Sequence, residues 1–293
     1  MSLQKISHPS PLAMRTWENL VGLDGHKQAL LDSLELLLAP DRFADWQRHH
    51  HPRGLKLAEL VDRSAPLVVL SGDVGCGKTA MATSVGNPLS KRLDAQVTLL
   101  EAPTGIRGKG LVGEMSSNIA ETFAKALREV PRKGYALLLL DEGDDLATSR
   151  EQLQAHHEDR AGVNALIKEI DSLAGEASRI AVVLCTNRGS ALDPALLRRA
   201  ALHLQFERPE GEALKGLLSV VLEGVQVDDK GLSRLLQRLP SDPPYTPSDL
   251  IHQVGRRAVL RAYRENRSIC LADFEAAVES IPPTPVFGRG DLA

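Results

Sequence analysis

The sequence predicts a doubly wound α/β domain with a parallel sheet, followed by a small all-helical domain. Up to Pro209, short continuously apolar segments alternate with helical patterns, an order typical of parallel strands buried on both faces. After Pro209 only helical patterns remain. The 293 residues are enough for two domains with their own cores.

The elements of the α/β part follow from apolar spacing. Apolar residues recur at helical intervals over Asp24–Leu38, and Pro40 ends that pattern. The polar run 47–54 contains three histidines and is expected to be a loop without a metal site. Strands are predicted at 67–70, 97–100, 136–140, 180–185 and 202–206, and the helices between them at 79–93, 114–129 and 160–173.

The second part reads as four helices, at 211–222, 231–239, 247–263 and 271–280. Thr246 before Pro247 predicts an N-cap with proline in the first turn. The predicted organisation is therefore a flexible tail at 1–15, an α/β domain at 16–208, a helical domain at 209–282 and a flexible tail at 283–293.

Composition excludes several classes of protein. Lys+Arg 35 against Asp+Glu 38 gives a net charge of −3, so nucleic acid is an unlikely partner, because phosphate binding favours a basic excess. The apolar runs are too short to span a bilayer. Three cysteines without paired spacing suit a reducing compartment, and we expect a cytoplasmic protein.

The motif G-x-x-x-x-G-K-[ST] appears once, after a predicted strand and before a predicted helix. Glycines let a backbone wrap closely around phosphate oxygens, and backbone N–H groups supply positive potential there. Lys78 is expected to reach the β- and γ-phosphates, and the Thr79 hydroxyl to bind Mg²⁺. The residues predicted to contact ATP or ADP in this loop are Asp73, Val74, Gly75, Cys76, Gly77, Lys78, Thr79 and Ala80.

Two carboxylates follow the apolar strand at 136–140. We expect Asp141 to hold the Mg²⁺ shell and Glu142 to polarise the water that attacks the γ-phosphate. Asn187 follows the next strand and is expected to contact the γ-phosphate or the water. Arg198 and Arg199 follow a short helix, and in a ring such an arginine stabilises charge in the neighbour's site.

The order of these motifs resembles that of the AAA+ ATPases over roughly residues 15–280. The resemblance identifies 72–79 as Walker A, 136–142 as Walker B, Asn187 as the first sensor, and Arg199, with Arg198 second, as the arginine finger. It also implies that the segment 17–24, with Val21 and Gly22, packs beside the adenine.

Within this family the sequence looks more like the pachytene-checkpoint type, which remodels HORMA-domain proteins. The resemblance rests on the segments 141–146, 162–171, 182–187 and 198–206. The last of these lacks the Arg-Pro-Gly-Arg-Phe run that is typical of the unfoldase group. It implies a homo-oligomer, most often a hexamer, a HORMA-domain partner and a similarity to small bacterial anti-phage members. The resemblance identifies the helical C-terminal part as the lid of the family. Its segment 246–250 lacks the second-sensor arginine that the pachytene-checkpoint type carries near this point.

The resemblance places Leu111 and Val112, between two glycines, in the central-pore loop that contacts a peptide. Translocating members usually carry an aromatic residue there, so we expect a modest grip on the peptide. Three alternatives remain open at this stage: a general unfoldase or protease-ring subunit, a clamp or helicase loader, and a nucleotide-gated scaffold with little turnover. The net charge disfavours the loader, and Glu142 disfavours the scaffold.

Overall fold

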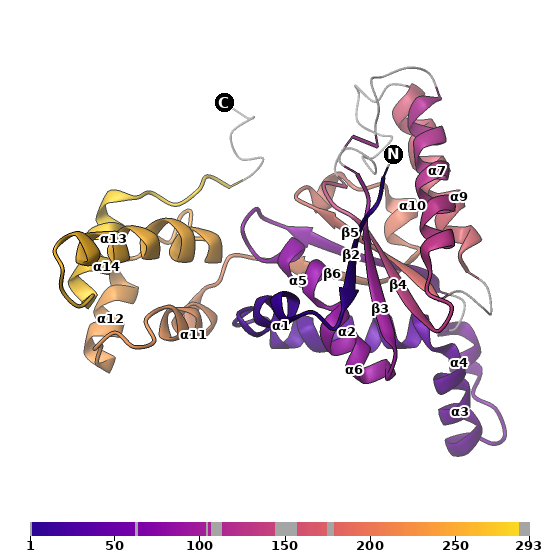
Figure 1. Cartoon of the computed structure of the whole chain (residues 1–293), viewed down its shortest axis with the longest axis horizontal. Helices are drawn as coiled ribbons and strands as arrows, with labels where there is room; N and C mark the ends of the chain where they lie inside the picture. The colour runs from indigo at the N-terminus through magenta and orange to yellow at the C-terminus, as the bar shows by residue number, and fades with distance from the viewer. Residues whose placement is uncertain are drawn as a thin grey trace. The chain divides into compact units, whose positions relative to one another are not determined.

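The computed structural model describes residues 2–61, 64–103, 105–106, 113–143, 157–174 and 179–286 (Figure 1). The chain divides into two compact units. The first comprises Met1–Asn19, Gly25–Ser71 and Lys78–Gln205, and the second comprises Leu20–Asp24, Gly72–Gly77 and Phe206–Ala293. The residues Gly72–Gly77 therefore group with the helical part of the chain.

The described residues form one six-stranded sheet in the order β1-β3-β4-β5-β2-β6. The pairs β2–β5, β3–β4 and β4–β5 are parallel, which confirms the predicted parallel sheet, whereas the unpredicted β1 pairs antiparallel with β3. The strands are β1 (Gln4–His8), β2 (Ala65–Gly72), β3 (Gln96–Glu101), β4 (Gly134–Leu140), β5 (Ile180–Thr186) and β6 (Ala200–Phe206).

Helices cover the sheet on both faces, because the central strands are apolar at consecutive positions and have no solvent face. On one face, Leu138 and Val182 join a core with Phe123 of α7 and Leu166 of α9. The helices of the first unit are α1 (Pro11–Glu18), α2 (Asp24–Leu38), α3 (Pro40–His50), α4 (Lys56–Val61), α5 (Lys78–Ser84), α6 (Gly86–Leu93), α7 (Glu114–Glu129), α9 (His157–Ser172), the short η1 (Gly189–Ala191) and α10 (Pro194–Leu197).

The N-terminal residues correct the prediction of a flexible tail at 1–15. Gln4–His8 forms β1, which pairs antiparallel with β3 from Gln4↔Glu101 to His8↔Val97. The strand has a polar sequence because it lies at the edge of the sheet, where most of its side chains are exposed. His8 alone is buried, and its Nδ1 lies 3.0 Å from Asn87 Oδ1.

Two helical boundaries also differ from the prediction. The expected loop at 47–54 is helical as far as His50, because α3 continues past the stacked rings of Phe43 and Trp46. The single helix expected at 79–93 is assigned as α5 and α6, which are separated by Val85. By contrast, α2 and α7 have the predicted bounds.

The second unit contains the helices α11 (Gly211–Val221), α12 (Asp229–Arg238), η2 (Asp249–Gly255), α13 (Arg256–Arg264) and α14 (Leu271–Ser280). Its core gathers Leu218, Leu235, Tyr245, Leu250 and Phe274. The expected helix at 247–263 is present, but its 249–255 stretch is π-helical. Thr246 caps it as predicted, because its Oγ1 accepts the Asp249 N–H at 3.0 Å.

The C-terminal tail predicted at 283–293 is partly fixed. The Thr284 hydroxyl donates to Asp249 Oδ1 at 2.6 Å, and its N–H donates to Oδ2 at 3.2 Å. Asp249 is 1% exposed, so this is a buried attachment rather than a surface contact. Residues 287–293 lie outside the described residues.

Candidate functional site

The carboxyl ends of β4 and β5 lie side by side and carry three of the predicted site residues. Leu140 pairs with Leu184 and Ser71 with Thr186, so the carboxyl ends of β4, β5 and β2 lie near one another. Asp141 and Glu142 follow β4, and Asn187 follows β5. Ligands of open α/β sheets bind at the carboxyl ends of the strands.

Lys78 and Asp141 both act on the buried thiol of Cys185 in β5. Burial raises the pKa of Cys185, the negative charge of Asp141 raises it further, and the positive charge of Lys78 lowers it. The Lys78 side chain, although charged, is itself buried in the first turn of α5. The structure therefore brings the predicted phosphate-binding lysine and the predicted metal-binding carboxylate to the same end of β5.

The turn after β4 fixes the Asp141 carboxylate and the backbone of Glu142. Glu142 has a left-handed backbone with φ of 54°, and its N–H donates to Asp141 Oδ1 at 2.9 Å. The next N–H, of Gly143, donates to the Cys185 carbonyl at 2.7 Å. Left-handed backbone at a non-glycine residue costs free energy and is concentrated at functional sites. Both acidic side chains are exposed at this strained turn.

Asn187 lies half-buried at the end of β5, directly after Thr186, whose side chain is buried. The Thr186 hydroxyl oxygen accepts the Arg188 N–H at 3.1 Å, which shapes the turn that presents Asn187. Asn187 therefore lies at the carboxyl end of β5, where the sequence predicted it.

Glu101 was not predicted as a site residue, and its carboxylate interacts with that of Asp141. Burial raises the pKa of Glu101 at the end of β3, and the negative charge of Asp141 raises it further. Its sequence signal was an acid that ends an apolar strand, the same signal that identified Asp141. A cation bound at these strand ends would relieve the repulsion between the two carboxylates.

The glycines of the phosphate loop adopt conformations that other residues rarely accept. Gly75 and Gly77 have φ of 78° and 98°. A Cβ at Gly75 would lie 2.8 Å from Thr246 Oγ1 and 2.9 Å from Ser248 Cβ. The Ser248 N–H donates to the Gly75 carbonyl at 3.2 Å. This cradle of close backbone fits a phosphate-binding loop, and the segment 246–248 contacts it directly.

Arg208 holds the second residue of this loop. Its Nε donates to Asp73 Oδ2 at 2.6 Å, and the two side chains are only 5% and 13% exposed. Asp73 Oδ1 in turn accepts the Val74 N–H at 2.8 Å. Asp73 therefore serves the loop through an ion pair and a backbone hydrogen bond, whereas the sequence predicted only contact with nucleotide.

The remaining donors of Arg208 join the loop to the C-terminal segment. Nη1 donates to the carbonyls of Pro244 and Thr284 at 2.6 and 2.7 Å, and Nη2 donates to that of Pro285 at 3.1 Å. Sequence reasoning missed Arg208. Nothing in the sequence indicates which arginine pairs with Asp73, because the two residues lie 135 positions apart.

Val21 and Gly22 lie in the short segment Leu20–Asp24. Val21 packs against the core of the helical unit, and Gly22, with φ of 73°, approaches the Ala213 carbonyl. A Cβ at Gly77 would lie 3.3 Å from Leu20 Cδ2. Of the segment predicted to pack beside adenine, the part Leu20–Asp24 therefore lies against the phosphate loop within the second unit.

The two candidate arginines differ in their contacts. Arg199 Nε donates to both carboxylate oxygens of Asp171 at 2.9 and 3.1 Å, and the two side chains are 39% and 46% exposed. Arg198 is exposed, and no ion pair of its side chain occurs among the described residues. The pore-loop residues Leu111 and Val112 lie outside the described residues.

The residues present fit Mg²⁺ and nucleotide. Mg²⁺ prefers one or two carboxylates together with phosphate and water oxygens, and the exposed Thr79 hydroxyl and Asp141 carboxylate are donors of that kind. Within the described part of the chain, no group of three or more His, Cys, Asp or Glu side chains forms a site that binds metal without such a ligand. No described helix has the length and apolar composition of a membrane span.

Comparison with known proteins gives consistent results. Residues 68–208 match the profile of the ATPase family associated with various cellular activities (AAA). CD-NTase-associated protein 6 of Escherichia coli strain MS 115-1 is 38% identical over 296 aligned positions, which cover 97% of this chain and 95% of that protein.

Two solved structures are similar over nearly the whole length. One is a chain of the E. coli MS115-1 HORMA:CdnC:Trip13 complex, with 37% identity, a TM-score of 0.89 and 97% of both chains covered. The other is Rhizobiales Trip13, with 33% identity, a TM-score of 0.75, and 96% of this chain and 98% of that one covered.

Proposed function

Because this chain belongs to the AAA ATPase family, in its Trip13-like branch, and hydrolyses ATP, we propose that it uses the hydrolysis to remodel a HORMA-domain protein. One observation carries the proposal. The chain matches, over 97% of both lengths, a protein solved in a complex with HORMA and CdnC. The match includes the helical unit as well as the ATPase core, at 37% identity and a TM-score of 0.89.

The hydrolysis step is assigned to residues of the first unit. Lys78 would bind the β- and γ-phosphates, and Thr79 and Asp141 would hold Mg²⁺, which would supply positive charge to the phosphate oxygens. Glu142 accepts a proton from the attacking water, and Asn187 orients that water. The charges of Lys78 and Asp141 both shift the pKa of the Cys185 thiol, which supports placing these two residues in one site.

The assembly is proposed to be a homo-oligomer, most simply a hexamer, in which Arg199 enters the neighbouring site. The Arg199–Asp171 pair is half-exposed, and such pairs contribute about 0–1 kcal/mol. A neighbour's phosphate could therefore replace Asp171 at small cost. Arg198, which has no ion pair among the described residues, is the second candidate for this role.

The partner is proposed to be engaged through Leu111 and Val112 in the central pore. A leucine side chain buries less area on a peptide than an aromatic side chain does, and burial contributes about 25 cal/mol per Å². This grip suits the release of a latched domain, such as a HORMA domain closed on a peptide. Stable folds would resist it.

The first prediction tests this function through Glu142→Gln. The variant should bind ATP like the parent but hydrolyse it about 10²-fold more slowly or worse, because the group that accepts the proton from water is missing. ATP-driven release of a labelled peptide from a HORMA-domain protein, followed by fluorescence anisotropy, should stop with hydrolysis. Glu223→Gln, which changes an exposed carboxylate of the helical unit, is the matched control and should release the peptide normally.

Two results would contradict the proposal. Parental turnover by Glu142→Gln would remove Glu142 from the mechanism. If the parent protein unfolded a stably folded, tagged reporter and left the HORMA–peptide complex intact, the general unfoldase would be the better function.

A further inference from the structure

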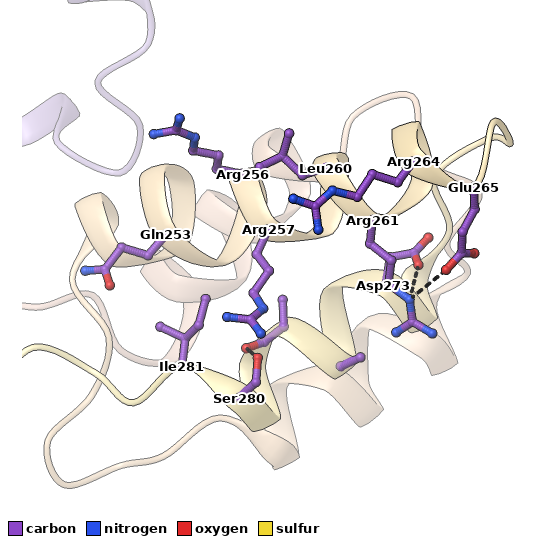
Figure 2. A pocket seen from close by; sticks show the side chains of 12 residues that line it. Gln253, Arg256, Arg257, Leu260, Arg261, Arg264, Glu265, Asp273, Ser280 and Ile281 are labelled. Carbon is purple, nitrogen blue, oxygen red and sulfur yellow. Dashed lines mark hydrogen bonds and ion pairs between the residues drawn. The ribbon is translucent and has the colours of Figure 1, made fainter.

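A hollow in the helical unit is lined by four arginines, three of which have no ion pair among the described residues. It lies between α13 and α14 and has a volume of about 730 Å³ (Figure 2). Four arginines of α13 line it, namely Arg256, Arg257, Arg261 and Arg264, and α14 contributes small and aliphatic residues such as Ala276 and Ala277.

Most arginines of the helical unit are neutralised within the chain. Arg234 and Arg238 pair with Glu275, and Arg267 pairs with Asp273 and Glu265. Arg261, inside the hollow, also lies within 3.4 Å of Glu265 and Asp273. The carboxylates of Glu265 and Asp273 also line the hollow. Both are already paired with Arg261 and Arg267.

Arg256, Arg257 and Arg264 are different. All three are exposed, and the described part of the chain offers none of them an ion pair or hydrogen bond to the side chain. Arg257 extends toward Ser280 and Ile281 at the end of α14 (Figure 2). Arg257 and Arg264 lie about two helical turns apart on α13. An anionic partner would supply the counter-charge that both lack.

We propose that this hollow, referred to below as the arginine groove, binds an acidic segment of a protein partner. The rise of α13 from Arg257 to Arg264 is roughly 10 Å, which matches about three residues of an extended peptide. Guanidinium groups recognise carboxylates with directed hydrogen bonds. The aliphatic part of the lining, with Leu260 and Ile281, suits an apolar side chain between the acids.

The lining favours a peptide over nucleic acid. Single-stranded nucleic acid binds through aromatic side chains on which its bases stack, and the groove has none among its lining residues. The net charge of the chain is −3, which also disfavours a general affinity for phosphate backbones. The site is separate from the phosphate loop, so the proposal goes beyond the function proposed above.

The experiment measures binding of a fluorescein-labelled peptide that alternates glutamate with leucine, by anisotropy with the full chain. The native protein should bind it, and affinity should fall with added salt, because the charges are exposed. The double variant Arg257→Gln, Arg264→Gln should bind at least about tenfold more weakly, with unchanged ATP hydrolysis and thermal unfolding. Arg128→Gln, which removes an exposed arginine of α7, should bind the peptide like the native protein.

Three results would overturn the proposal. The first is equal binding of the peptide by the native protein and the double variant. The second is preferential binding of a labelled single-stranded oligonucleotide that the double variant loses, which would make the groove a nucleic-acid site. The third is a change of oligomeric mass of the double variant in light scattering, which would assign the groove to contacts between copies of the chain.

Discussion

At the scale of single residues, the phosphate loop depends on glycine at position 75 for two separate reasons. Its φ of 78° lies in the left-handed region, which costs other residues free energy. In addition, a side chain there would collide with Thr246 and Ser248 at less than 3 Å. The loop and the segment 246–248 therefore cannot keep their present contact if a methyl group is added.

We expect Gly75→Ala to weaken ATP binding by at least about tenfold, because the loop must move and its N–H groups lose their common direction. Titration with a fluorescent ATP analogue measures the effect. Gly216→Ala, at a helical position in α11 with open space around it, is the matched control and should bind ATP normally. Normal binding by Gly75→Ala would mean that the loop does not need the observed conformation.

At the scale of elements, the C-terminal segment and the phosphate loop meet at Arg208. Its buried pair with Asp73 and its hydrogen bonds to Pro244, Thr284 and Pro285 join three stretches of chain. Removing one partner of a buried ion pair typically costs about 3–5 kcal/mol, because the other charge stays buried alone.

Arg208→Gln should therefore lower the stability of the protein by a few kcal/mol and raise the KM for ATP, with a smaller change in kcat. The reason is that Asp73, and with it the Val74 N–H, loses its fixed position. Urea unfolding and steady-state kinetics measure the two effects. Arg238→Gln breaks a half-exposed pair and should change neither. If Arg208→Gln left KM unchanged, the ion pair would only stabilise the fold.

The N-terminal strand makes stability depend on pH through His8. Burial lowers the pKa of His8, although the hydrogen bond with Asn87 opposes this, and the buried His8 Nε2 has no hydrogen-bond partner among the described residues. Because the folded protein disfavours the charged imidazole, the stability that neutral His8 provides is fully present above the unfolded pKa of about 6.5 and is lost as pH falls through the folded value.

Urea unfolding at pH 7.5 and pH 5.5 should therefore show a fall in stability, limited for one proton to about 1.4 kcal/mol per pH unit. His8→Gln should flatten this part of the pH dependence. His49→Gln, at an exposed position in α3, should leave it as in the parent. An identical pH profile for the parent and His8→Gln would show that other groups cause the fall.

At the scale of the whole molecule, the assignment of Arg199 requires a second copy of the chain. If Arg199 completes the neighbour's site, Arg199→Ala should bind ATP but hydrolyse it at least about 10³-fold more slowly. Lys78→Ala should fail to bind ATP. Mixed rings of the two variants should recover part of the activity, because some interfaces pair an intact Lys78 with an intact Arg199.

The measurement is ATP turnover of mixtures whose exchange of subunits is verified by mass spectrometry. Asp171→Asn is the matched control. It removes the partner of Arg199 within the same chain and should retain most of the turnover if Asp171 only orients the arginine. Verified mixed rings without recovered turnover would leave Arg199 as a residue that stabilises its own chain through Asp171.

Features that depend on local pattern could be predicted from the order of the residues alone. Continuous apolar strands, helical spacing and the glycine-rich motif predicted the sheet, the helical unit and the positions of Asp141, Glu142 and Asn187 at strand ends. These predictions succeed because burial on both faces and the parallel direction of the strands leave few arrangements open.

Features whose partners lie far apart in the chain could not be predicted and became visible only in the folded molecule. The polar segment Gln4–His8 is a strand because β3 offers it an open edge, and nothing in its own sequence indicates this. The pairing of Asp73 with Arg208 spans 135 residues, and Thr284 is fixed by Asp249 across 35 residues. Such contacts depend on which surfaces folding brings together. The periodicity of a sequence indicates only the secondary structure of each segment and which of its faces is buried.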